Sequence, residues 1–352
     1  MSSGKWIALM LLAVVASASA TWLVLKPANN RNSNNSTVNT GSEMAANHTG
    51  LPCDNVSIVR DNDPSLTKPF LYADVSCESD ALQPLKTRLT AYIEEQKTSG
   101  VITRASVYYK ELNSLHWTSA FKGELYYPGS TMKVPLLLTI LKQAQRDKTL
   151  LERKMQFQTP TKIEVLYPAQ NPMVVGNFYT VQELLERMIL KSDNDATSLL
   201  FSIYNKDLYD DLFIKLSIPV QGAEDIFYQI APSDISKFMR VLYNASYLSS
   251  LYSEYALDLL TKAEFKNGIL AGVPPSVKVA HKFGERFTTG DLMQLHETAI
   301  VYRGGTAYAV TIMTEGKDTN QLAVVVGQLS KICYEQKKPS AQDPMKVTTH
   351  QT

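Results

Sequence analysis

The chain has 352 residues, of which 44% are hydrophobic and 20% charged, as expected for a globular protein with one large domain or two modest ones. Its 35 Lys and Arg residues nearly balance its 34 Asp and Glu residues, which leaves a formal net charge of +1. Without a strong positive field, binding to nucleic acid is not expected.

The N-terminal region contains a candidate membrane segment. Residues 6–25 carry no charge and lie between Lys5 and Lys26, and about 20 apolar residues are enough to cross a bilayer as a helix. The small-x-small pattern at residues 18–20 offers the alternative of a cleaved signal peptide. We favour an uncleaved anchor, because the apolar run continues past that site. Under both interpretations the rest of the chain is exported across the membrane.

The residues after this segment are rich in Asn, Ser, Thr and Gly up to about position 50. Such a composition buries too little apolar surface to fold, so it predicts a flexible tether. We expect the folded part to lie outside the cytoplasmic membrane, either periplasmic or on the cell surface. The predicted parts are a short N-terminal segment (1–5), the anchor or signal peptide (6–25), the tether (26–65), a folded domain (66–337) and a polar tail (338–352).

The cysteines are Cys53, Cys77 and Cys333. In an oxidising compartment a bridge between Cys53 and Cys77 would close a loop at the entry to the folded domain, and we favour this pairing although others stay open. The histidines and cysteines show no metal-ligand spacing. No metal and no organic cofactor is therefore predicted.

Hydrophobic periodicity predicts the elements in chain order. Leu82, Leu85 and Leu89 fall at helical spacing within residues 81–96, and Gly100 would end that helix. Two strand-like runs, residues 105–110 and 116–121, predict a β-hairpin.

An apolar helix then begins near Ser130. A later helix begins at Thr180, whose capping box is completed by Glu183. Further helices are predicted at residues 195–204, 234–242, 252–261 and 321–334, and further strands at residues 277–281, 297–302 and 308–314.

The predicted strands lie at the two ends of the chain, with helices between them. This order predicts an α/β fold of the α+β type: a mostly antiparallel sheet flanked by helices, with an inserted all-α subdomain. A cleft is expected where the sheet meets the subdomain.

Three short motifs follow one another in the predicted domain: Ser-Thr-Met-Lys at 130–133, Ser-Asp-Asn at 192–194 and Lys-Phe-Gly at 282–284. The first is common by chance, and it also occurs at Ser65 and Lys68. At Ser130, however, a Pro-Gly turn precedes the motif and an apolar helix follows it, which places Ser130 and Lys133 on one helix face.

A serine hydroxyl becomes a good nucleophile when a nearby base takes its proton, and an enclosed lysine with a lowered pKa can be that base. We therefore interpret Ser130 as a nucleophile and Lys133 as its base. The alternative is a helix-capping serine with a surface lysine. Capping is likewise the alternative for Ser192 and Asn194.

With these motifs in this order, the chain resembles class A β-lactamases and related penicillin-recognising enzymes from about residue 70 to 335. The resemblance implies the β-lactamase/transpeptidase-like fold and an acyl-enzyme at Ser130. It implies that Ser192 passes a proton to the leaving nitrogen and that Asn194 holds the substrate amide.

The resemblance also implies roles for the third motif. Lys282 would supply positive charge for a substrate carboxylate, and Gly284 would let the substrate approach the backbone. The N–H of Glu285 would join that of Ser130 as an oxyanion hole.

The chain departs from the family pattern in two places. Phe283 stands where the family has Thr or Ser, so a hydroxyl that binds the carboxylate is missing. Between Asn194 and Pro232 there is no Glu-x-x-Leu-Asn, the pattern that positions the deacylating water, and Glu224 is the candidate substitute.

We expect a membrane-tethered, monomeric serine hydrolase that opens β-lactam rings. The alternatives are a D-alanyl-D-alanine carboxypeptidase or transpeptidase, and a non-catalytic module that binds cell-wall peptide in a degenerate site.

Overall fold

The computed structural model describes residues 56–61, 66–162, 167, 171–220, 227–288 and 290–336. The predicted membrane segment, Cys53 and the polar tail lie outside these ranges, so the anchor and the Cys53–Cys77 bridge stay predictions. Within the described ranges, no helix is both long enough and apolar enough to span a bilayer.

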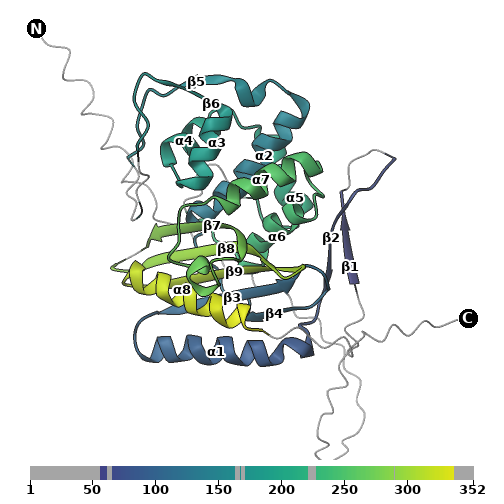
Figure 1. Cartoon of the computed structure of the whole chain (residues 1–352), viewed down its shortest axis with the longest axis vertical. Helices are drawn as coiled ribbons and strands as arrows, with labels where there is room; N and C mark the ends of the chain where they lie inside the picture. The colour runs from purple at the N-terminus through teal and green to yellow at the C-terminus, as the bar shows by residue number, and fades with distance from the viewer. Residues whose placement is uncertain are drawn as a thin grey trace, which may run out of the picture. The chain divides into compact units, whose positions relative to one another are not determined.

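A five-stranded antiparallel sheet forms the centre of the folded part, with the strand order β4-β3-β9-β8-β7 (Figure 1). Two smaller sheets each pair two strands, β1 with β2 and β5 with β6. The strands are β1 (Val56–Arg60), β2 (Phe70–Val75), β3 (Arg104–Glu111), β4 (Trp117–Ala120), β5 (Lys154–Gln156), β6 (Phe178–Thr180), β7 (Lys278–Phe287), β8 (Met293–Arg303) and β9 (Thr306–Gly316).

The central sheet joins the two ends of the domain, as the sequence predicts. β3 and β4 come from its N-terminal part and pair with β9, while β7, β8 and β9 follow the helices. Gly304 and Gly305 turn β8 into β9, and both have positive φ, 52° and 78°. A two-residue hairpin turn of this type requires positive φ at both positions, which glycine adopts without a steric cost.

Helices cover both faces of the central sheet. α1 and α8 pack on one face, and the helical subdomain contacts the other face through α6 and α7 (Figure 1). The helices are α1 (Gln83–Thr98), α2 (Lys133–Arg146), α3 (Val181–Leu190), α4 (Asn194–Phe201), α5 (Lys206–Lys215), α6 (Pro232–Tyr243), α7 (Ser250–Thr261) and α8 (Thr319–Tyr334), with short 3-10 helices η1 (Asp80–Leu82), η2 (Gly129–Met132), η3 (Leu150–Glu152) and η4 (Ile269–Gly272).

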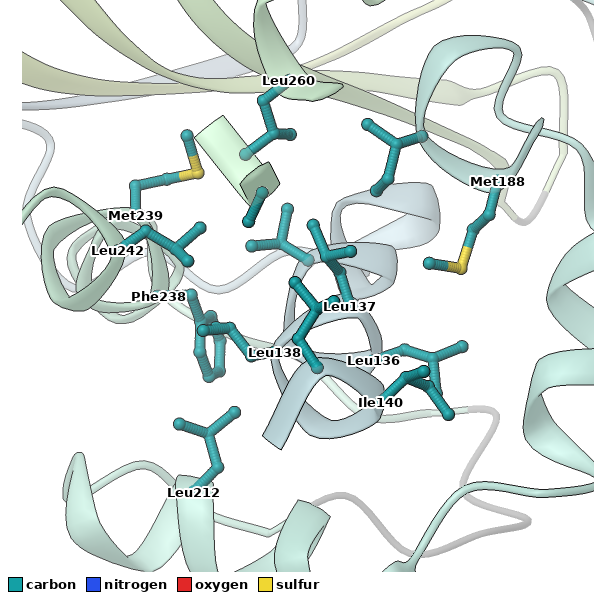
Figure 2. Packing of buried hydrophobic residues seen from close by; sticks show 14 of the residues in the cluster. Leu136, Leu137, Leu138, Ile140, Met188, Leu212, Phe238, Met239, Leu242 and Leu260 are labelled. Atoms are coloured by element: carbon teal, nitrogen blue, oxygen red, sulfur yellow. The ribbon is translucent and has the colours of Figure 1, made fainter. Parts of the chain in front are cut away.

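Each face of the sheet has its own hydrophobic core. One core lies between the sheet and α1 and α8, and the other fills the helical subdomain around α2. Leu137 and Leu138 of α2 are fully buried in the second core beside Phe238 and Leu212 (Figure 2). Because α2 begins directly after the Ser130 motif, this core fixes the position of that motif.

The first strand corrects one boundary of the sequence-based division. Residues 56–60, the end of the predicted tether, form β1 and pair with β2. This strand has only five residues and directly follows a polar stretch, which is too little for an apolar pattern to predict it. Helix α5 and the short pair β5–β6 were also not predicted.

Shortening a side chain in the core around α2 should destabilise the protein. Leu138→Ala removes a fully buried side chain, so we expect the free energy of unfolding to fall by about 2–5 kcal/mol in urea titrations. The control is Val324→Ala in α8, a side chain that is 61% exposed and should change stability by about 0.5 kcal/mol or less. Equal effects of the two variants would contradict this assignment of the core.

Candidate active site

Ser130 lies in η2, immediately before the first turn of α2. Its side chain is half-buried and lines a cavity of about 480 Å³. Lys133, Ser192, Asn194 and Glu285 line the same cavity. The structure therefore brings residues of the first two motifs, and the residue that follows the third, to one solvent-accessible pocket, which scattered capping residues would not do.

Lys133 is held among polar groups from the turn between α3 and α4. Its Nζ donates to the carbonyl oxygen of Ser192 at 2.6 Å, to the Oγ of Ser192 at 3.2 Å and to the Oδ1 of Asn194 at 2.7 Å. The side chain is only 4% exposed. Burial lowers the pKa of Lys133 to about 7, against the opposing attraction of Asp193 and Glu285. A large share of the amine is therefore neutral near pH 7 and able to accept a proton.

The turn that carries Ser192 and Asn194 is capped by the residue between them. Asp193 accepts hydrogen bonds from the backbone N–H groups of Asp195 and Ala196, which makes it the N-cap of α4, and it forms an ion pair with Arg187 at 2.7 Å. The side chains of Ser192 and Asn194 are thus not used as caps and instead contact Lys133. Ser192 has a φ of 55°, which is uncommon for a residue other than glycine and concentrates at functional sites.

Lys282 reaches the same turn from β7. Its Nζ donates to the Oγ of Ser192 at 2.9 Å and to the carbonyl oxygen of Phe283 at 2.8 Å. Ser192 is therefore bonded to two lysines, Lys133 and Lys282. Burial, together with the charge of Lys133, lowers the pKa of Lys282 well below its usual value. Lys282 is fully buried and is not among the described residues that line the cavity.

Gly284 allows β7 to lie directly against η2. A Cβ at Gly284 would lie 2.8 Å from the backbone nitrogen of Ser130 and 2.7 Å from the carbonyl oxygen of Pro128. A Cβ at Gly129, which has a φ of 54°, would lie 2.5 Å from the carbonyl oxygen of Glu285. Backbone thus occupies the space that a side chain at Gly284 would need. This packing places the backbone of Gly284 and Glu285 directly against the backbone of Ser130.

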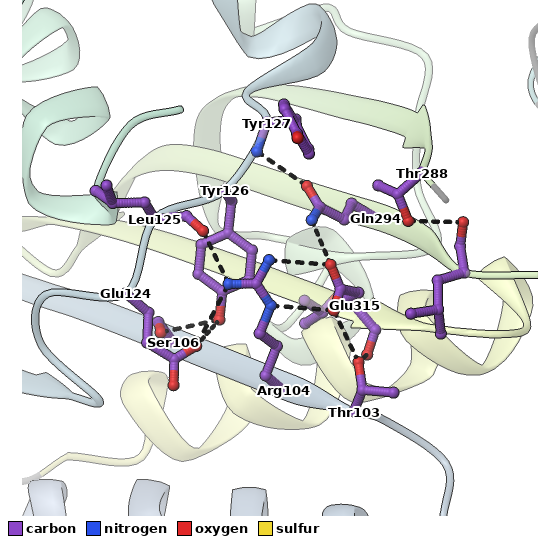
Figure 3. A network of polar contacts seen from close by, with 12 residues as sticks. Thr103, Arg104, Ser106, Glu124, Leu125, Tyr126, Tyr127, Thr288, Gln294 and Glu315 are labelled. Carbon is purple, nitrogen blue, oxygen red and sulfur yellow. Dashed lines mark hydrogen bonds and ion pairs between the residues drawn. The ribbon is translucent and has the colours of Figure 1, made fainter. Parts of the chain in front are cut away.

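A partly buried polar network fixes the chain segment that leads into Ser130 (Figure 3). The N–H of Tyr127 donates to the Oε1 of Gln294 at 3.0 Å, and Gln294 donates in turn to Glu315. Glu315 accepts two hydrogen bonds from Arg104, at 3.1 and 3.0 Å. The Arg104 guanidinium lies 4.3 Å from the ring centroid of Tyr126. The network thereby ties the segment before Ser130 to β3, β8 and β9.

His296 of β8 completes this anchoring. Its Nδ1 accepts a hydrogen bond from the N–H of Thr314 at 3.2 Å, so the proton of a neutral ring lies on Nε2, which is 3.0 Å from the carbonyl oxygen of Tyr127. Burial lowers the pKa of His296 to about 3, so the ring stays neutral. In the sequence the histidines stand out only by their lack of metal-ligand spacing, and this contact joins residues 169 positions apart.

An aromatic cluster borders the cavity at β7. Phe283 stacks on Phe265 at 4.3 Å between ring centroids, and Tyr167 meets both rings edge-on. The backbone N–H of Tyr167 donates to the Oε1 of Glu285 at 3.3 Å. Phe201 and Phe287, each 42% exposed, also line the cavity. The sequence singled out Phe283 only for its missing hydroxyl.

A family model described as the beta-lactamase enzyme family matches residues 84–336. The chain belongs to the beta-lactamase enzyme family. No curated protein matches it by sequence.

This chain has the same fold as solved structures of beta-lactamases and of PBP-A. PBP-A, in a variant described as an acyl-enzyme complex with penicillin G, is 19% identical with a TM-score of 0.59, over 72% of this chain and 96% of that chain. The extended-spectrum beta-lactamase TLA-1 is 14% identical with a TM-score of 0.62, over 71% and 98%. A class A beta-lactamase from Mycobacterium abscessus is 17% identical with a TM-score of 0.60, over 70% and 98%. The expected β-lactamase/transpeptidase-like fold is thus confirmed.

Glu224, the candidate deacylation base of this family member, lies outside the described residues. Among the described residues that line the cavity, Glu285 is the one carboxylate. The expectation that an acyl-enzyme would be hydrolysed slowly therefore depends on the sequence, which lacks the family's deacylation motif between Asn194 and Pro232.

A methyl group at position 284 should disrupt the proposed oxyanion hole. In Gly284→Ala, the Cβ would meet backbone atoms of η2 at less than 3 Å and force β7 away from Ser130. We expect the rate of acylation of Ser130 by a β-lactam to fall about 100-fold, the typical loss when one oxyanion donor is removed. A urea titration in parallel monitors the stability of the variant. A folded Gly284→Ala variant with an unchanged acylation rate would contradict the role of this contact.

Proposed function

We propose that Ser130 attacks the carbonyl carbon of a β-lactam and forms a covalent acyl-enzyme. Lys133 takes the proton of the Ser130 hydroxyl, and Ser192 passes a proton to the leaving nitrogen. The N–H groups of Ser130 and Glu285 stabilise the oxyanion, and Asn194 orients the substrate amide.

The observation that carries this proposal is the environment of Lys133. An amine must be neutral to act as a base, and an exposed lysine is almost fully protonated at pH 7. Lys133 is buried and forms no ion pair within the described part of the chain, and its pKa is lowered to about 7. A lysine that only stabilises the fold is usually charged and paired with a carboxylate, whereas a base must be neutral.

Slow hydrolysis of the acyl-enzyme is part of the proposal, because the sequence lacks the family's deacylation motif. This feature also favours the second candidate, a D-alanyl-D-alanine carboxypeptidase or transpeptidase. The third candidate, a non-catalytic module that binds cell-wall peptide, is motivated by Phe283. The buried Lys133 argues against this third candidate.

We further propose that the domain acts as a monomer outside the cytoplasmic membrane, held there by residues 6–25. The apolar composition of that segment and the polar stretch after it support this location.

Incubation with a fluorescent penicillin, followed by intact-protein mass measurement, tests the acyl-enzyme. We expect the mass to increase by one penicillin, and this adduct to be absent in Ser130→Ala. The matched control is Ser198→Ala, since Ser198 is an exposed residue of α4 that does not line the cavity, and it should react like the native protein.

The same measurement separates the candidates. Rapid loss of the adduct with hydrolysis of a chromogenic cephalosporin would show a true β-lactamase. An adduct that persists for minutes or longer supports slow deacylation. No adduct in the native, folded protein would overturn the proposal and favour the binding module.

A further inference from the structure

The lysine from which a β-lactam carboxylate would draw its positive anchor is not accessible from this cavity. Lys282 is the residue from which the resemblance expects this charge, yet its side chain has no exposed surface. Its Nζ already donates to Ser192 and to the carbonyl oxygen of Phe283. A carboxylate in the cavity would therefore have to displace these bonds before it reached the amine.

The residue after Lys282, Phe283, offers no hydroxyl that could bind the carboxylate in place of the lysine charge. The ring of Phe283 is 5% exposed and packs between Phe265 and Tyr167. A stacked phenyl ring offers a carboxylate no hydrogen-bond donor, and a carboxylate that loses its hydration without a partner is costly to bind.

The fixed charges on the cavity wall do not favour an anion either. Glu285 and Arg286, neighbours on β7, both line the cavity with charges of −1 and +1 that offset each other, and Lys133, which also lines it, is partly neutral near pH 7 because burial lowers its pKa to about 7. The Arg286 guanidinium lies 4.5 Å from the ring centroid of Tyr127. Glu285 is close enough to act electrostatically on both Lys133 and Lys282. A substrate carboxylate near these lysines would meet this like charge.

Among the described residues, the remaining side chains on the cavity wall are largely apolar, with Thr197 as a polar exception. Met132, Phe201, Phe287 and Tyr167 contribute to it. Phe201 lies at the end of α4 and Phe287 at the end of β7, so two separate elements each place an exposed phenyl ring at this cavity. Exposed aromatic rings at a cavity are a common means of binding apolar parts of a ligand.

The leaving group matters as much as the acyl group. When a β-lactam ring opens, the leaving nitrogen stays attached to the acyl group and keeps blocking the side near Ser192. An alcohol released from an ester diffuses away, so water can enter at the vacated place beside Ser192 and Lys133. The groups that served acylation can then serve hydrolysis, and no separate loop glutamate is needed.

We propose that the substrate turned over at this site is a neutral carboxylic ester with an apolar acyl group. This inference rests on the proposed role of Ser130. The Ser130 oxygen bonds to the acyl carbon as its proton passes to Lys133. The bond from that carbon to the alcohol oxygen then breaks as Ser192 gives its proton to the alcohol and takes the proton held by Lys133. Water next bonds to the acyl carbon as its proton passes to Lys133, and the bond from that carbon to the Ser130 oxygen breaks as Ser130 takes the proton from Lys133 and the acid is released.

Two chromogenic esters that differ chiefly in one carboxylate test this inference. They are p-nitrophenyl valerate and the p-nitrophenyl monoester of glutaric acid, whose acyl chains have the same length. We expect kcat/KM to be at least about tenfold higher for the valerate ester, and turnover of both to be lost in Ser130→Ala.

Variants on β7 test the cause of this preference. Glu285→Gln keeps the backbone N–H but removes the negative charge, so the preference for the neutral ester should shrink. Glu152→Gln, a change at an exposed glutamate that does not line the cavity, is the matched control and should leave the ratio unchanged. An anchoring role for Arg286 would instead give a preference for the glutarate ester that Arg286→Gln abolishes, and this result would overturn the inference.

The fluorescent-penicillin experiment keeps the two proposals apart. If neither ester is hydrolysed but the penicillin adduct forms at Ser130, the inference on the substrate fails and the proposed function stands. If neither the ester nor penicillin reacts, both fail.

Discussion

The active site depends on the burial of one amine, the Nζ of Lys133. Removing a charged lysine from water costs several kcal/mol, which hydrogen bonds alone offset only in part. The protein supplies three acceptors at 2.6, 2.7 and 3.2 Å, all from Ser192 and Asn194. It supplies no carboxylate in direct contact within the described part of the chain. The result is an amine that polar groups hold in place but no carboxylate contacts, so burial lowers its pKa to about 7, and a general base must be able to lose its proton near the working pH.

The rest of the fold serves to keep that arrangement in place. The core around α2 fixes the helix that carries Lys133, and the cap at Asp193 fixes the turn that carries its acceptors. On the opposite side, Gly284 lets β7 lie against the backbone of Ser130. The network from Arg104 to Tyr127 then holds the segment before Ser130 from the sheet side. The nucleophile is thus positioned by backbone contacts, while its base is positioned by side-chain hydrogen bonds.

The sequence predicts those parts of this architecture that depend on local patterns. The capping box at Thr180 and Glu183 is present as expected, because both partners lie within one helical turn. The convergence of the three motifs could be predicted because their order resembles that of a known family. The helices and strands expected around them are present, with boundaries that differ by a few residues.

The parts that could not be predicted depend on contacts between residues far apart in the chain. Arg104 and Glu315 are separated by 211 positions, and no periodicity links them. At Gly284 the structure shows a contact that local patterns do not indicate, with backbone atoms of Pro128, Ser130 and Thr131. β1 was missed because it is short, follows a polar stretch and is held by its pairing with β2. In each case the deciding neighbour comes from another element of the fold.

The protonation state of Lys133 tests the account most directly. In the folded protein with lysine labelled by 13C and 15N, the Lys133 resonance can be assigned from its loss in Lys133→Arg and followed by NMR as a function of pH. The account predicts that this amine titrates near pH 7, so that it is mostly neutral by pH 8. A midpoint near the ordinary lysine value of about 10.5 would mean that the amine stays charged, and Lys133 would then not be the base.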